Sequence, residues 1–182
     1  VMTEVTSLER VLTTLGHREP DRVPWFLLVT LHGAKELEMS IREYFAKAEN
    51  VVEGQLRLRA KYRHDCLYPF FYAALETEAW GSPPIFFDDG PPNAGEPIIN
   101  KPADILALEV PEVTKQPCAQ VLKAIALLKE RVGNAAPIIG VVMSPFSLPV
   151  MQMGYEKYIE LMYEHPALFE RPKSGFVLPF DR

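Results

Sequence analysis

Residues 23–31, VPWFLLVTL, decide the fold class, because they form an apolar run without the alternation of a half-buried strand. A strand that is buried on both faces, as in a parallel sheet, has this composition. Two later runs share it, CLYPFFY at residues 66–72 and PIIGVVM at residues 137–143. The three runs therefore predict three buried parallel strands.

Helical patterns separate these runs. Two of them open with the spacing of a capping box, Thr6 with Glu9 and Ser40 with Glu43. Apolar residues at helical intervals extend each pattern, and the second is expected to break near Asn50. The helices expected from these patterns cover residues 6–16, 40–62, 75–81, 116–131 and 155–163.

The alternation of helix and apolar run predicts an α/β fold built from right-handed parallel units. An eight-stranded barrel typically needs about 250 residues, whereas this chain has 182. We therefore expect an incomplete (β/α)8 TIM-type barrel with parallel strands, forming a single domain over residues 1–182. Residues 82–111 are rich in Pro and Gly and predict an insertion with small strands at 85–87 and 98–99. Residues 170–182 are atypical of the rest, and we expect a tail there.

Composition excludes several classes of function. The net charge of −5 and the scattered Lys and Arg give no basic surface for nucleic acid. No apolar stretch approaches the roughly 20 residues that span a bilayer, and the N-terminus lacks the pattern of a signal peptide. A cytoplasmic protein with reduced Cys66 and Cys118 is expected.

Three segments in order carry a family resemblance: SLERVLTTLGHREPDRVPW at residues 7–25, HDCLYPFFYAALETEAWG at 64–81 and IIGVVMSPFSLPVMQMG at 138–154. Over about residues 5–170 the chain resembles the N-terminal half of the uroporphyrinogen decarboxylase superfamily. That superfamily also contains corrinoid-dependent and coenzyme M methyltransferases. The resemblance implies a TIM barrel whose second half lies beyond the matched segments.

Two departures from the decarboxylases favour the methyltransferase branch. Those enzymes hold substrate carboxylates with an Arg-x-x-x-Arg sequence after the first strand, where this chain reads TLHGAKELE around Ala34, without arginine. They also carry an acid on the second strand, where this chain has Tyr72. The resemblance then implies methyl transfer from a corrinoid to a thiol. Two alternatives stay open, a decarboxylase-like tetrapyrrole enzyme and a non-catalytic, truncated or assembly half barrel.

The methyltransferase branch implies corrinoid and zinc as cofactors. Its zinc ligands, His-x-Cys and a distant Cys, belong to the C-terminal half, so the resemblance places no metal ligands or known catalytic residues in this chain. The implied partners are a corrinoid protein or a tetrapyrrole ligand, together with a second copy in a homo-oligomer or a complementary C-terminal half.

The candidate contacts for substrate or corrinoid lie where the three runs end, because a parallel barrel gathers its active-site loops there. They are His32, Tyr68, Tyr72, Met143, Ser144 and Phe146. Core packing is the alternative for the aromatic side chains, and simple solvation is the alternative for His32.

Other polar residues receive structural interpretations. His64 and Cys66 share one face of an extended strand, as zinc ligands do, but no third ligand is near in sequence. Asp88 and Asp89 before Gly90 are typical of a turn. Glu76 and Glu78 are an unpromising acid and base pair, because residues two apart on a helix do not share a face.

Overall fold

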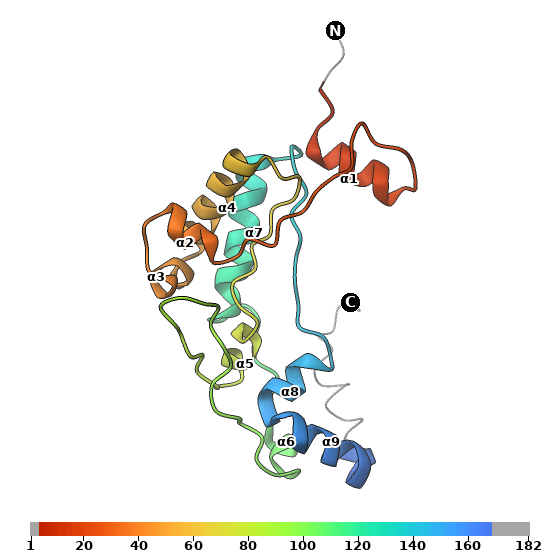
Figure 1. Ribbon diagram of the computed structural model, residues 1–182. Coiled ribbons are helices and arrows are strands. Elements are labelled where there is room, and N and C mark those ends of the chain that lie inside the picture. Colours follow the sequence, from red (N-terminus) through yellow and green to blue (C-terminus); the bar gives the residue numbers. More distant parts are fainter. Residues whose placement is uncertain (1–3, 169–182) are drawn as a thin grey trace. The chain divides into compact units, whose positions relative to one another are not determined.

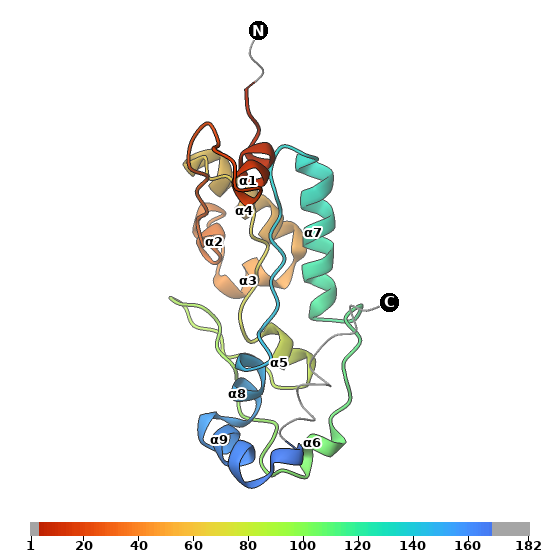
Figure 2. The same cartoon turned by 90° about the vertical axis from the view of Figure 1, so that its right-hand side faces the viewer.

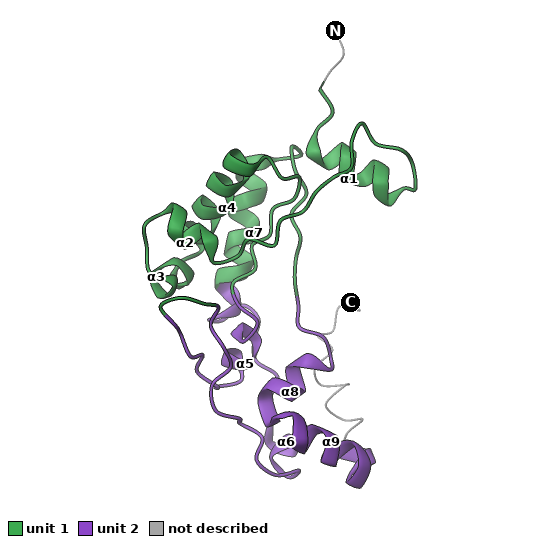
Figure 3. Cartoon of the chain, in the orientation of Figure 1, with its two compact units in different colours: residues 1–71, 88–90, 120–141 green, residues 72–87, 91–119, 142–182 purple. Residues whose placement is uncertain are grey.

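The computed structural model describes residues 4–168. They form two compact units (Figures 1 and 3). Unit 1 contains the described residues up to 71 together with 88–90 and 120–141, and unit 2 contains 72–87, 91–119 and the described residues from 142. The atypical tail predicted at residues 170–182 lies outside the described residues.

The helices of unit 1 confirm the two capping boxes. They are α1 (Ser7–Leu15), α2 (His32–Glu36), α3 (Ile41–Ala46), α4 (Ala48–Tyr62) and most of α7 (Cys118–Val132). In each box the hydroxyl accepts a backbone N–H three residues on, from Glu9 to Thr6 at 3.2 Å and from Glu43 to Ser40 at 3.2 Å. The expected break in the second helix falls at Lys47, whose backbone is extended.

Tyr44 fixes how α2, α3 and α4 pack. Its side chain is fully buried. A Cβ atom added to Gly33 of α2 would lie 2.2 Å from the Tyr44 hydroxyl, and one added to Gly54 of α4 would lie 2.7 Å from it. Only glycine at both positions leaves room for this ring. Figure 2 shows α7 beside α4, and the Ala48 N–H of α4 donates to Gln120 Oε1 of α7 at 2.8 Å.

The three apolar runs are extended, but the prediction of regular strands buried on both faces is wrong. Within the described part of unit 1, one isolated parallel bridge joins Leu67 to Ile138, and no continuous ladder forms there. Along the first run Val23 is 82% and Leu28 64% exposed. The described part of the chain therefore leaves these two apolar side chains largely uncovered.

Gln55 explains part of this irregular pairing. Its fully buried amide donates to the Val29 carbonyl at 3.0 Å and accepts the Tyr68 N–H at 3.1 Å. The side chain thus occupies the place where backbone groups of the first and second runs would otherwise meet. It satisfies both backbone groups, which would be costly to bury unpaired.

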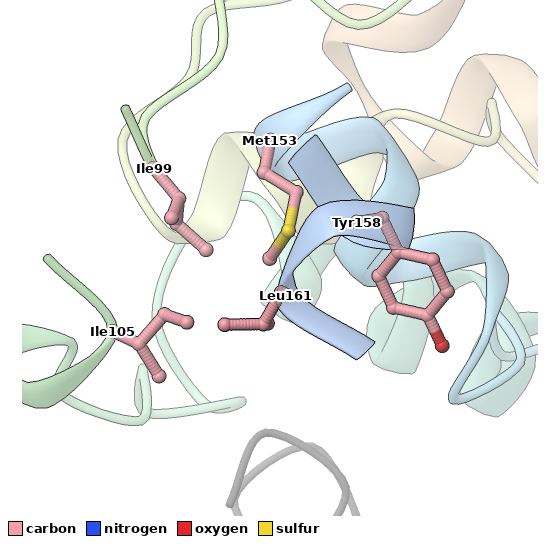
Figure 4. Close-up of a cluster of buried hydrophobic side chains, with 5 residues drawn as sticks. All are labelled: Ile99, Ile105, Met153, Tyr158 and Leu161. Carbon is pink, nitrogen blue, oxygen red and sulfur yellow. The ribbon is translucent and has the colours of Figure 1, made fainter. Parts of the chain in front are cut away.

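Unit 2 has a separate apolar core. Its helices are α5 (Leu75–Ala79), α6 (Asp104–Ala107), α8 (Ser147–Met153) and α9 (Tyr155–Glu164). A buried cluster joins α6, α8 and α9, as Figure 4 shows: Ile99, Ile105, Met153, Tyr158 and Leu161. The small strands expected at 85–87 and 98–99 reduce to one antiparallel bridge, Ile85 with Asn93, and to two N–H groups, of Ile98 and Ile99, that donate to the Gln152 carbonyl.

Among the residues that the structure describes, every helix is too short or too polar to cross a membrane.

Candidate functional site

The predicted contact residues divide between the two units. His32 and Tyr68 belong to unit 1, and Tyr72, Met143, Ser144 and Phe146 belong to unit 2. Tyr72 is buried, Tyr68 and Met143 are half-buried, and the other three are exposed. The contact residues of unit 1 and those of unit 2 are therefore two separate sets.

In unit 2, the short helix α5 brings Tyr72 and Met143 together. The Tyr72 hydroxyl donates to Glu78 Oε2 at 2.5 Å, and the Met143 N–H donates to Glu76 Oε1 at 2.7 Å. The two carboxylates point to different partners, as their spacing on a helix requires. Helix α5 thus connects the end of the second run to the end of the third.

The carboxylates of Glu76 and Glu78 accept hydrogen bonds from neutral groups, a backbone N–H and a tyrosine hydroxyl. Burial raises the pKa of Glu76, and the Met143 N–H only partly opposes it. Burial, followed by the neighbouring Glu78 carboxylate, raises the pKa of the Tyr72 hydroxyl. Burial and the charge of Glu76 likewise raise the pKa of Cys118. The group keeps Tyr72 and Cys118 protonated at neutral pH and favours proton uptake by Glu76.

Ser144 and Phe146 have structural roles in unit 2. The Ser144 hydroxyl accepts the Ser147 N–H at 3.0 Å at the start of α8. The Phe146 ring packs edge-on against Tyr158, with centroids 5.1 Å apart, and is 53% exposed. Phe146 is therefore partly exposed, while Ser144 bonds the first residue of α8.

In unit 1, Tyr68 is the middle of a row of three aromatic rings. Its centroid lies 5.1 Å from that of Phe26 and 5.5 Å from that of Phe70. Phe26 is 43% exposed, and the other two are half-buried. We call Phe26, Tyr68 and Phe70 the aromatic row. His32 was expected in a turn, but it is the exposed first residue of α2.

His64 and Cys66 are both buried, directly after the end of α4. Nδ1 of His64 lies 2.7 Å from the backbone carbonyl oxygen of Cys66. Because a carbonyl oxygen only accepts, the Nδ1–H group donates this hydrogen bond. Burial lowers the pKa of His64 and raises that of the Cys66 thiol. No cluster of three or more His, Cys, Asp or Glu in the described residues has the arrangement of a metal site.

Two other acidic pairs were considered in the sequence, Asp88 with Asp89 and Glu76 with Glu78. Asp88 and Asp89 are exposed before Gly90, whose φ is 144°, as a turn predicts. Glu76 and Glu78 were set aside as an acid and base pair, yet they are the side chains that organise α5. A Glu-x-Glu pattern directly after an aromatic run was the signal that could have identified them.

A family model described as uroporphyrinogen decarboxylase (URO-D) matches residues 6–172. The chain belongs to this family. The resemblance inferred from three short segments is thereby confirmed.

Two relatives extend this result. The chain is 32% identical over 126 residues to uroporphyrinogen decarboxylase of Methylococcus capsulatus, which covers 66% of this chain and 35% of that protein. It superposes on a methyltransferase from Methanosarcina mazei with a TM-score of 0.82 and 18% identity, covering 94% of this chain and 52% of that one. The fold is therefore shared with a methyltransferase. The chain spans about a third of the first relative and about half of the second.

Proposed function

We propose that this chain forms the tetrapyrrole-facing half of a methyltransferase that moves a methyl group from a corrinoid to a thiol. Helix α2 carries the proposal. It follows the first run, where the decarboxylase resemblance implies two arginines, and it buries Gly33 and Ala34 against α4 instead. Small buried residues at this place hold no substrate carboxylate, so a tetrapyrrole with many acidic side chains finds no guanidinium partner here.

The aromatic row fits a corrinoid. A flat macrocycle binds to aromatic faces through apolar area and stacking, and the row exposes part of Phe26 beside Tyr68. A bound methylcorrinoid would supply the methyl group. The role of this chain is to hold the ring system and to exclude water from one of its faces.

Zinc does not fit the residues that the structure describes. Cys66 and Cys118 are apart from any set of three ligands, and burial raises the pKa of each thiol. A thiol that stays protonated is a poor metal ligand. No step of the proposal therefore uses zinc held by this chain.

A decarboxylase-like activity is the second candidate, and the identity to the Methylococcus decarboxylase favours it. Its substrate carries carboxylates, so it requires cationic side chains near the macrocycle. Lys35 of α2 is exposed and is the nearest cation in sequence to the expected arginine positions. A strong preference for acidic porphyrins would support this candidate.

The experiment is a titration of the 182-residue chain with methylcobalamin, followed by quenching of tryptophan fluorescence. Replacement of Tyr68 by Ala removes the middle ring of the row. We expect a loss of affinity of about fivefold, because one aromatic contact is worth about 1 kcal/mol.

Tyr163→Ala is the matched control, because Tyr163 is 76% exposed on α9 of unit 2. This variant is expected to bind methylcobalamin as the unmodified chain does. Equal affinities for the Tyr68 and Tyr163 variants, or no saturable binding by the unmodified chain, would show that the row is not a corrinoid surface.

A further inference from the structure

Unit 2 contains a pocket beside the end of α5 that the proposed function does not use. Its volume is about 560 Å³, within the range of roughly 300–1,000 Å³ that small-molecule sites have. The pocket is lined by Ala79 and Trp80 from the end of α5 and by residues 107–112, 115 and 116 from the segment that follows α6. All of these residues belong to unit 2, whereas the aromatic row belongs to unit 1.

The structure of unit 2 holds both parts of this lining in place. The Trp80 N–H donates to the Thr77 carbonyl at 3.1 Å, at the end of α5. Leu108 packs against the buried apolar cluster of unit 2. The Lys115 N–H donates to the Glu112 carbonyl at 2.9 Å and closes a turn. The pocket is therefore formed before a ligand binds, so binding does not have to order these segments first.

The lining combines apolar side chains with an aromatic ring. Leu108 and Pro111 are half-buried, and Val110 is 53% exposed. Trp80 is half-buried and lines the pocket with them. Burial of a ligand's apolar body against such side chains is favourable, and tryptophan is also the aromatic side chain that attracts cations most strongly.

The charged side chains of the lining determine which sign of charge the ligand carries. Lys115 forms an ion pair with Glu112 at 2.9 Å, which offsets the charge of the lysine. Glu109 forms no ion pair among the residues that the structure describes. The lining therefore keeps one uncompensated negative charge, and the net charge of −5 of the whole chain also favours a cation.

We infer that this pocket binds a small organic ammonium ion. The apolar or aromatic body of the ligand lies against Trp80 and Leu108, and its charged nitrogen lies beside Glu109. A neutral ligand of the same shape gains the apolar contacts alone, and an anion is repelled by Glu109. The pocket therefore discriminates between ligands of similar shape by their charge.

Three probes of similar shape and different charge test the inference: 2-phenylethylammonium, 2-phenylethanol and 3-phenylpropionate. Each is titrated into the full 182-residue chain, and NMR follows the indole N–H signals of Trp25 and Trp80. We expect a saturable shift of the Trp80 signal with 2-phenylethylammonium. Its affinity should be at least about fivefold higher than that of 2-phenylethanol, because the charge adds an ion pair and a cation–π contact. The Trp25 indole belongs to unit 1, where it donates to the Arg63 carbonyl, and its signal should not shift.

Two exposed glutamates provide the variant and its control. Glu109→Gln should weaken binding of 2-phenylethylammonium about threefold to fivefold and leave the affinity for 2-phenylethanol unchanged. Glu156→Gln, on the exposed side of α9 in the same unit, should bind both probes as the unmodified chain does.

Four results would overturn the inference. They are no saturable shift of the Trp80 signal, equal affinities for the ammonium probe and the alcohol, tighter binding of 3-phenylpropionate, and equal affinities of the Glu109 and Glu156 variants for the ammonium probe. No tetrapyrrole is present, so the outcome is independent of the proposed function.

Discussion

Asp65, the buried carboxylate of unit 1, bonds to cations, whereas the carboxylates of α5 in unit 2 bond to neutral groups. Asp65 is fully buried and bonds two guanidinium groups, of Arg10 at 2.8 Å and of Arg22 at 2.8 and 2.9 Å. Glu76 and Glu78 bond a backbone N–H and a tyrosine hydroxyl. No cation forms an ion pair with either glutamate among the described residues.

The difference in partners gives Asp65 a structural role and leaves Glu76 able to take up a proton. Burial disfavours the charge of Asp65, but the bonds from Arg22, from the Trp25 N–H, from Ser7 and from Arg10 outweigh it and lower the pKa. The charge of Asp65 is therefore fixed, and it ties α1 to the first and second runs. Burial without a cation raises the pKa of Glu76. A carboxylate of that kind takes up a proton at a higher pH than an ordinary glutamate does.

The largest expected effect comes from neutralising Asp65. Asp65→Asn removes the buried carboxylate that Arg10 and Arg22 share and should lower the free energy of unfolding by about 3 kcal/mol, because breaking a buried ion pair by removing one partner is strongly destabilising. Urea unfolding followed by circular dichroism measures the change.

Asp21→Asn is the control for this variant. Asp21 bonds Arg10, and its side chain is 39% exposed, so the loss should be clearly smaller than that of Asp65→Asn. Acid gives a second check. Because the folded pKa of Asp65 lies below 3.8, its contribution is complete above that pH and disappears as pH falls through the lowered value. Equal losses for the two variants would contradict the structural role of the buried Asp65 carboxylate.

A smaller effect of opposite sign is expected at Glu76. Its folded pKa is raised above 4.5, so the folded chain retains a proton that the unfolded chain has lost. The stability contributed by this group therefore falls as pH rises from about 4.5 through the raised pKa. Glu76→Gln keeps an acceptor for the Met143 N–H and should remove this slope from the unfolding free energy measured against pH.

Glu160→Gln, on the exposed side of α9, is the matched control and should keep the slope of the unmodified chain. A Glu76→Gln variant with an unchanged slope would mean that Glu76 is not a proton-exchanging carboxylate.

Local signals in the sequence predicted local structure. Both capping boxes lie within four residues, so α1 and α3 begin where the sequence places them. The short helices α2, α6 and α8 were missed, because each is only four to seven residues long and offers too few positions for a helical repeat of apolar residues. Burial of Val23 was predicted wrongly, because an apolar run does not show whether a neighbour covers it.

The candidate sites show the same limit. The sequence predicted Tyr72 as a contact for substrate or corrinoid, and that remains a prediction, whereas its hydrogen-bond partner Glu78 was set aside. The Asp65 network was not found, because Arg10 and Arg22 are 55 and 43 residues away in sequence and share no local pattern with it. Family membership came from three motifs, each carried by contiguous residues.

The most direct test of the proposed function is a competition between two tetrapyrroles for the 182-residue chain. Equilibrium dialysis against equal concentrations of methylcobalamin and an octacarboxylic porphyrin measures which one the chain retains. Because α2 presents buried Gly33 and Ala34 in place of arginines, we predict that methylcobalamin is retained in excess. Preferential retention of the acidic porphyrin would contradict the account and would favour a decarboxylase-like function.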